Sequence, residues 1–321
     1  MASKCQPGLV QHLREEIETE TAGSPVNVGQ LWTNRSTREL SEVMAERGFA
    51  ACPNTIDRLL REELGLGRRQ AVKDRALGQC PDRDAQFKRI AELRRSFTCW
   101  GQPVISIDTK KKEMLGNFYR PGTARTDGLV HTLDHDFGSV GNGKLIPYGV
   151  YDVNANEALM ALAQGSDTGE LVGDAIRRWY HRMGRYRYGG ANRMLVLADA
   201  GGSNGCRVGL FREKLWELSR DLGMSIRVAH FPSYCSKYNP IDHRLFSHVS
   251  RSLKGIIFRN VEAVAEAIAT TKTSTGLQVK VEVMKRIYER GIKATENFLM
   301  GNFIRPDDEI PKYNYKTIHY Q

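Results

Sequence analysis

Two short apolar segments that each end in an aspartate constrain the fold of this chain more than any other feature. The first is residues 103–108, with the sequence PVISID, and the second is residues 194–199, with the sequence MLVLAD. Short runs of β-branched and aliphatic residues are typical of buried strands. Further strands are expected at 145–153 and 225–230, and helices at 167–183 and 205–222. This alternation predicts an α/β domain over residues 98–321.

A third acid follows the two that end these strands. Asp242 lies in the first turn of a helix expected to begin near Pro240, with Asn239 as its N-cap. Active sites of open α/β sheets form outside the carboxyl ends of strands, so we expect Asp108 and Asp199 to lie there. Three adjacent carboxylates repel one another unless cations neutralise them, and Mg²⁺ prefers such oxygen ligands. Taken alone, each acid is better explained as a strand-end cap or, for Asp242, as an acid stabilising a helix N-terminus, but the three together in this context are not.

Residues 1–65 are expected to be all helical. Ser36 and Glu39 have the spacing of a capping box, which opens a helix that Gly48 ends. A second start signal at residues 54–57 then predicts a helix-turn-helix. An ordinary helical hairpin is the alternative. If the motif binds DNA, its second helix presents side chains suited to base edges and phosphates, namely Asn54, Thr55, Arg58 and Arg61.

Residues 66–97 are expected to be a basic linker. They hold nine basic and four acidic residues, a net charge of about +5. The first half looks extended, whereas residues 84–97 have helical periodicity. Arg68 and Arg69 are candidate phosphate contacts, although a solvated tether explains the composition almost as well.

The charge of the whole chain also favours a polyanionic partner, with 47 Lys and Arg against 37 Asp and Glu and a net charge of +10. A merely basic protein is the alternative. Residues 175–198 contain no acid and interleave basic with aromatic side chains, which suits DNA contact, although half of those aromatics are expected to face the core. In the α/β domain, the side chains expected to contact DNA are Lys110, Arg182, Arg185, Arg187, Lys237, Arg244 and Arg251.

Several other classes of protein and site are disfavoured. The six cysteines have neither CxxC nor zinc-finger spacing, which indicates free thiols in a reducing cytoplasm. The first twenty residues lack the long apolar run of a signal peptide or membrane anchor, so we expect a cytoplasmic location. His131 and His135, beside Asp134 and Asp136, imitate a metal cluster, but a hydrogen-bonded hairpin is the expected structure.

Several motifs in a fixed order resemble the insertion-sequence DDE transposases of the ISAzo-thirteen type, which are related to the Tc/mariner group. They are ISIDTKKKE at 105–113, GNF at 116–118, HDF at 135–137, YGVYD at 148–152, LADAGGSNG at 197–205 and NPIDHRLF at 239–246. STREL at 36–40 and CPDRDAQF at 80–87 fit as well. The resemblance runs from about residue 30 to the end. It implies a bacterial, nucleoid-associated protein whose RNase H-like domain has a mixed five-stranded sheet flanked by helices.

The resemblance also implies site residues and a reaction. Asp108 is the first and bridging carboxylate, Asp199 the second, and Asp242 the third, where the family commonly has Glu. Two Mg²⁺ or Mn²⁺ ions are implied, with His243 and Asn204 supporting the acids. The implied enzyme cleaves the terminal inverted repeats of its element and joins the 3′-OH to target duplex DNA, as a homodimer. A non-cutting DNA-binding regulator and a stand-alone RNase H-like nuclease are the alternatives.

Overall fold

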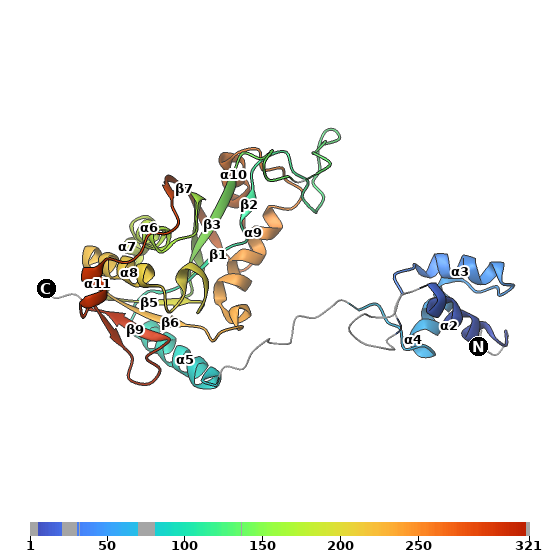
Figure 1. The fold of residues 1–321 in the computed structure, drawn as a ribbon, viewed down its shortest axis with the longest axis horizontal. Coiled ribbons are helices and arrows are strands. Elements are labelled where there is room, and N and C mark those ends of the chain that lie inside the picture. Colours follow the sequence, from blue (N-terminus) through green and yellow to red (C-terminus); the bar gives the residue numbers. More distant parts are fainter. Residues whose placement is uncertain (1–5, 21–30, 32, 70–80, 136, 319–321) are drawn as a thin grey trace. The chain divides into compact units, whose positions relative to one another are not determined.

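The computed structural model describes residues 6–20, 31, 33–69, 81–135 and 137–318. The chain divides into two compact units, Met1–Arg75 and Ala76–Gln321, and each is described by itself (Figure 1). In the described part of the chain, no helix combines the length and apolarity needed to cross a membrane.

The first unit is all helical in its described residues. Its helices are α2 (Leu9–Glu20), α3 (Thr37–Glu46) and α4 (Pro53–Glu62). They share one small core, to which each helix contributes a face: Leu9, Leu13, Ile17, Leu40, Met44, Ile56, Leu59 and Leu60. The expected capping box is confirmed, because the Ser36 side chain accepts from the N–H of Glu39 and the Glu39 carboxylate accepts from the N–H of Ser36.

The second unit begins with helix α5 (Arg83–Cys99), which confirms the helical periodicity of residues 84–97. This helix packs on the sheet through Ile90 and Phe97. The side-chain amide of Gln86 donates to the backbone carbonyl of His230, and Arg89 pairs with Asp307 over 2.9 Å. The part of the expected linker from residue 83 onwards is therefore an integral helix of the larger unit, whereas residues 70–80 lie outside the described residues.

The larger unit is built on one mixed sheet, with nine strands in the described residues, in the order β7-β4-β3-β1-β5-β6-β9-β8 and with β2 paired to β3. The strands are β1 (Val104–Thr109), β2 (Glu113–Met114), β3 (Lys144–Asp152), β4 (Glu157–Gly165), β5 (Arg193–Ala198), β6 (Ser225–His230), β7 (Gln278–Tyr288), β8 (Ile304–Pro306) and β9 (Asn314–Thr317). The central strands β4-β3-β1-β5-β6 form the mixed five-stranded core expected of an RNase H-like domain. In this core β3 is antiparallel to both neighbours, and β1, β5 and β6 are parallel.

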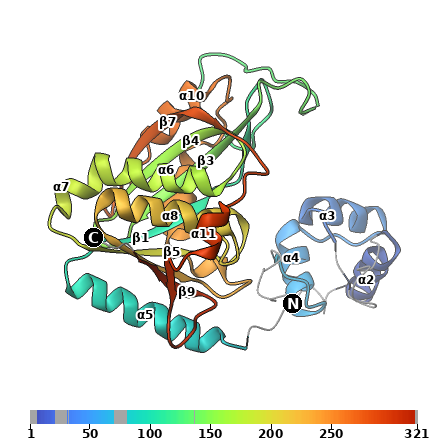
Figure 2. The same cartoon turned by 60° about the vertical axis from the view of Figure 1, so that its left-hand side comes forward.

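Helices cover both faces of this sheet. One face packs against α6 (Gly169–Trp179) and α8 (Gly209–Leu222), which Figure 2 shows side by side. The other face packs against α5, α9 (Ser247–Ser252) and α10 (Val261–Ala269). Shorter elements complete the domain: η1 (Tyr180–Gly184), α7 (Arg185–Arg187), η2 (Gly202–Asn204), η3 (Ser236–Tyr238), η4 (Asp242–Phe246) and α11 (Glu296–Met300).

Candidate active site

Asp108, on β1, and Asp199, the residue directly after β5, lie at the same level of two neighbouring parallel strands. Ser106 of β1 is in register with Leu197 of β5, and each aspartate lies two residues further along its strand direction. Both carboxylates therefore emerge at the carboxyl end of the sheet, on the same side of the pleat as their register partners. They line a cavity of about 460 Å³, together with the glycine-rich loop after β5 and the loop after β6.

Asp242 opens the π-helical turn η4, which follows the loop after β6. Its charge acts on both Asp108 and Asp199, so the three acids share one electrostatic environment. Within residues 6–20, 31, 33–69, 81–135 and 137–318, no three His, Cys, Asp or Glu side chains lie close enough together to hold one metal ion as they stand.

The pKa values of all three acids are raised. Burial, and then the charge of Asp199, raises the pKa of Asp108 to about 7, although the N–H of Thr109 donates to its carboxylate over 2.8 Å and opposes the rise. Burial and the charge of Asp242 raise the pKa of Asp199 to about 6. Burial also raises the pKa of Asp242. Carboxylates held under mutual repulsion are a donor set that fits hard divalent cations such as Mg²⁺.

A fourth carboxylate, Asp167, acts on the same group. Its charge raises the pKa of Asp108, and its Oδ1 atom is buried without a hydrogen-bond partner. In the structure Thr168 caps α6, accepting from the N–H of Leu171. Asp167 was missed as a site residue because only the fold brings it near β1.

Asn239 connects the elements that carry the three acids. Its side chain is fully buried, and Nδ2 donates to Asp199 Oδ1 over 3.1 Å and to the carbonyl oxygen of Ile107 over 3.4 Å. Its Oδ1 accepts from the hydroxyl of Ser106. The N–H of Asp242 donates to the backbone carbonyl of Asn239 over 3.1 Å. Asn239 precedes the helix as expected, but its side chain binds β1 and Asp199 instead of capping that helix.

Asn204 anchors the loop that follows Asp199. Asn204 is buried, and its Oδ1 accepts from the hydroxyl of Tyr148 over 2.8 Å. Its backbone carbonyl lies 2.9 Å from Nε2 of His230, a fully buried ring at the end of β6. Asn204 thus fixes the loop whose Gly201 and Gly202 line the cavity beside the acids. His243 is exposed, and its charge opposes the rise in the pKa of Asp242.

The candidate DNA-binding side chains of the first unit lie on α4 or just after it. Asn54 and Arg61 are exposed, whereas Thr55 and Arg58 are half-buried. Arg61 pairs with Asp57 over 2.8 Å. Arg68 and Arg69 are exposed beyond the helix end.

In the larger unit, six of the seven expected DNA contacts are exposed, namely Arg182, Arg185, Arg187, Lys237, Arg244 and Arg251. Lys110 differs from the expectation, because only 9% of its surface is exposed and its ammonium donates to Glu113 over 2.7 Å. Lys110 pairs with Glu113 inside the protein, because β2 brings Glu113 back against the end of β1. Among the aromatics of residues 175–198, Trp179 and Tyr188 are core residues and Tyr186 is exposed.

The remaining candidates form no site. His135 lies 3.9 Å from Asp134 with both side chains largely exposed, and Asp136 is outside the described residues. Cys52, Cys99, Cys206 and Cys235 are free thiols, as expected, and Cys5 and Cys80 lie outside the described residues.

Comparisons with known proteins give one family and one set of similar structures. The family described as the Rhodopirellula transposase DDE domain matches residues 12–319, which confirms the resemblance drawn from the motifs. The Mos1 transposase paired-end complex with left transposon end has 14% identity and a TM-score of 0.43, covering 80% of this chain and 68% of that chain. The mariner Mos1 paired end complex with Mg has 16% identity and a TM-score of 0.43, covering 81% and 70%. No curated protein matches the chain.

Proposed function

Because this chain belongs to the family of the Rhodopirellula transposase DDE domain, we propose that it cuts the ends of a mobile element and joins the freed 3′-OH to target DNA. The observation that carries this proposal is the level placement of Asp108 on β1 and of Asp199 directly after the adjacent parallel strand β5, with Asp242 acting on both. In an RNase H-like sheet, carboxylates lie in this way at the carboxyl ends of the strands, where a phosphodiester of an extended polymer can reach them.

Asp108, Asp199 and Asp242 are the residues that would hold two Mg²⁺ or Mn²⁺ ions. Such ions, when bound, activate the attacking oxygen and stabilise the leaving oxygen of a phosphodiester. Asp108 is the natural shared ligand, because both other acids act on it. Asp242 supplies the same carboxylate chemistry as the more usual Glu on an arm one methylene shorter.

The surrounding residues orient the acids and the DNA. Asn239 holds one oxygen of Asp199, which leaves the other oxygen free for a ligand. The loop of Gly201 and Gly202 lines the cavity without side chains, so its backbone can approach a phosphate closely. No protein nucleophile is required, because water and then the DNA 3′-OH attack.

DNA is the proposed partner of both units. The helix-turn-helix of residues 1–65 would bind the terminal inverted repeats through the exposed side of α4. The catalytic unit of residues 98–321, preceded by α5, would hold the reacting strand and target DNA through its exposed basic residues. Two element ends must be processed together, so a homodimer on DNA is the proposed assembly.

The test incubates the full chain and Asp108→Ala with duplexes from DNA flanking its own gene, with Mg²⁺ or Mn²⁺. The control is Asp134→Ala, which removes an exposed carboxylate outside the cavity. We expect cleaved ends and joined products from the wild type and the control, and at least a hundredfold loss in Asp108→Ala. Binding without cleavage would favour a regulator, cleavage without joining would favour a nuclease, and unchanged cleavage by Asp108→Ala would remove the assigned site.

A further inference from the structure

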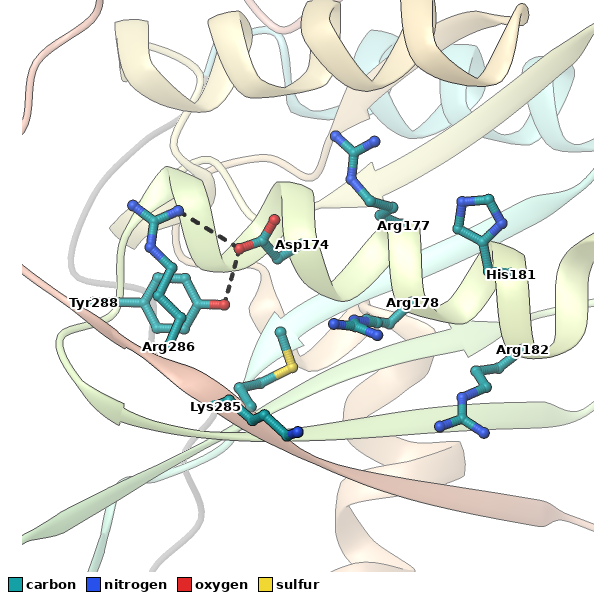
Figure 3. Close-up of a pocket in the computed structure, with 9 residues that line it drawn as sticks. Asp174, Arg177, Arg178, His181, Arg182, Lys285, Arg286 and Tyr288 are labelled. Atoms are coloured by element: carbon teal, nitrogen blue, oxygen red, sulfur yellow. Dashed lines mark hydrogen bonds and ion pairs between the residues drawn. The ribbon is translucent and has the colours of Figure 1, made fainter.

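A second cavity, of about 450 Å³, lies between helix α6 with its π-helical extension η1 and the edge strand β7 (Figure 3). It shares no lining residue with the cavity of the acids. Its charged and titratable lining residues are Asp174, Arg177, Arg178, His181, Arg182, Lys285, Arg286 and Tyr288. A single carboxylate beside four arginines and one lysine makes this a basic groove, and we use that name for it below.

Both walls of the basic groove contribute cations. Arg178 and Arg182 stand one helical turn apart and extend towards β7, where Lys285 and Arg286 lie (Figure 3). Arg177 points the other way in that view and pairs with Asp221 of α8 over 2.6 Å. The cations that face each other across the basic groove therefore belong to two elements that are distant in sequence, namely α6 with η1, and β7.

Carboxylates hold these guanidinium groups in place without neutralising the basic groove. Arg178 and Arg182 share one carboxylate, Glu282, each over 3.2 Å. Arg286 pairs with Glu170 over 2.6 Å and lies 3.8 Å from Asp174. Against these three carboxylates stand four cations, Arg178, Arg182, Lys285 and Arg286, which leaves a net charge of +1. Lys280 adds a further positive charge, because its ammonium lies 3.5 Å from the carbonyl oxygen of Arg182.

The arginines remain available to a ligand. Arg178, Arg182 and Arg286 are 55%, 63% and 52% exposed. Each guanidinium has five N–H donors, and ion pairs this exposed stabilise by only about 0–1 kcal/mol, so a phosphate can bind beside or in place of the carboxylate. The shared Glu282 limits the freedom of two side chains before any ligand arrives, which favours binding.

The β7 residues of the basic groove lie beyond the level of Asp108 in the direction in which their strands run. Strands β1, β4 and β7 run in one direction, because β1 and β4 are both antiparallel to β3 and β7 is parallel to β4. Through the register of these strands, Asp108 is level with Val281 of β7. Lys285, Arg286 and Tyr288 therefore lie further along β7, towards the end of the sheet at which Asp108 lies on β1.

From this placement we propose that the basic groove binds the sugar-phosphate backbone of the same duplex DNA that the acids act on. The proposal rests on the proposed function in taking DNA as the substrate. It adds Arg178, Lys285 and Arg286 to the DNA-contacting residues and gives Arg182 a defined place among them. The contact carries no sequence information, because phosphate is its only target.

The test measures binding of the full chain to a fluorescent duplex of about 30 base pairs, in EDTA, over a series of KCl concentrations. The variant is Arg182→Gln/Lys285→Gln, which leaves Glu282 paired with Arg178. The matched control is Arg305→Gln/Lys312→Gln, which removes one exposed Arg and one exposed Lys near the opposite edge of the sheet. Equal thermal unfolding midpoints establish that both variants are folded.

Each lost phosphate contact lowers the slope of log K against log salt by about 0.9. We expect the basic-groove variant to lose about 1.8 from this slope, and the control less than half as much. Duplex DNA should also slow acylation of Lys285 by an amine-reactive reagent, relative to Lys312. Equal slopes for the two variants, or acylation of Lys285 unchanged by DNA, would overturn the proposal and leave another anion, such as an acidic peptide, as the occupant. No metal and no cleavage is involved, so the result is independent of the outcome of the cleavage test.

Discussion

The side-chain amide of Asn239 donates a hydrogen bond to Asp199 over 3.1 Å, while its carbonyl oxygen accepts from the hydroxyl of Ser106. One fully buried side chain thus ties β1, the residue after β5 and the segment before Asp242 together. The relative positions of the acids depend on this amide, because no other side chain among the described residues donates to a carboxylate oxygen of any of the three.

Replacing Asn239 should impair the site more than the fold. Asn239→Ala removes the donor to Asp199, so we expect at least a tenfold loss of cleavage and a higher Mn²⁺ concentration for half-maximal rate. Ser106→Ala is the control, because it removes one of the two contacts of Asn239 to β1 and keeps the donor to Asp199. Binding of Mn²⁺ to the DNA-free protein, followed by calorimetry, should weaken in Asn239→Ala and stay near wild type in Ser106→Ala. Equal weakening in both variants would mean that Asn239 acts only through packing.

The raised pKa of Asp108 makes metal-free stability depend on pH. In the folded state its pKa is about 7, against an ordinary value of 3.8, so the folded state binds more protons between these two values. Stability is therefore highest at low pH within this window and falls as the pH rises through about 7. We expect the unfolding midpoint of the second unit in EDTA to fall between pH 5.5 and pH 8, as measured by calorimetry.

Asp108→Asn should remove most of this dependence. The amide carries no charge at any pH, so at pH 8 we expect a gain of about 2–4 °C for each kcal/mol by which the burial of this charge and its repulsion by Asp199 are relieved. At pH 5.5, where Asp108 is largely protonated, the gain should be smaller. A variant that is equally stabilised at both pH values would contradict the origin assigned to this pKa.

The importance of the side-chain length of the third acid, Asp242, can be tested by substitution. Asp242→Glu restores the residue more usual in the family, and the half-buried site leaves the longer arm access to solvent. We expect Asp242→Glu to keep cleavage within about tenfold of wild type, because both side chains are carboxylates. Asp242→Asn should lose at least a hundredfold under the same assay. Full activity in Asp242→Asn would show that this residue is not a ligand.

Lys110 should affect stability, and its neighbour Lys111 should affect DNA binding. Lys110→Met leaves buried Glu113 with Arg120 as its remaining ion-pair partner, so we expect a destabilisation on the order of 1–3 kcal/mol. Lys111 is exposed next to it, and Lys111→Met should leave the unfolding midpoint unchanged. Denaturant unfolding and duplex binding should separate the two variants. A weakened salt dependence of binding in Lys110→Met would restore it as a DNA contact.

The local sequence determined which segments form the sheet and where its acids fall. Residues 103–108 and 194–199 have the composition of buried strands, and the structure has β1 and β5 there, with Asp108 and Asp199 near their carboxyl ends. The register of the parallel pairing between these two strands then fixes the level of the two acids. The motifs in fixed order were enough to indicate the family.

The tertiary structure decided how polar side chains are used. Lys110 and Arg182 look alike in the sequence, yet one is buried against Glu113 and the other lines the basic groove. Asn239 has the position of a helix cap and instead holds Asp199. Where a strand forms or a helix begins depends on residues only a few positions away in the chain. Local sequence patterns therefore contain this information. An ion pair or a buried amide depends on partners that can lie more than a hundred residues away, and only the fold brings these together.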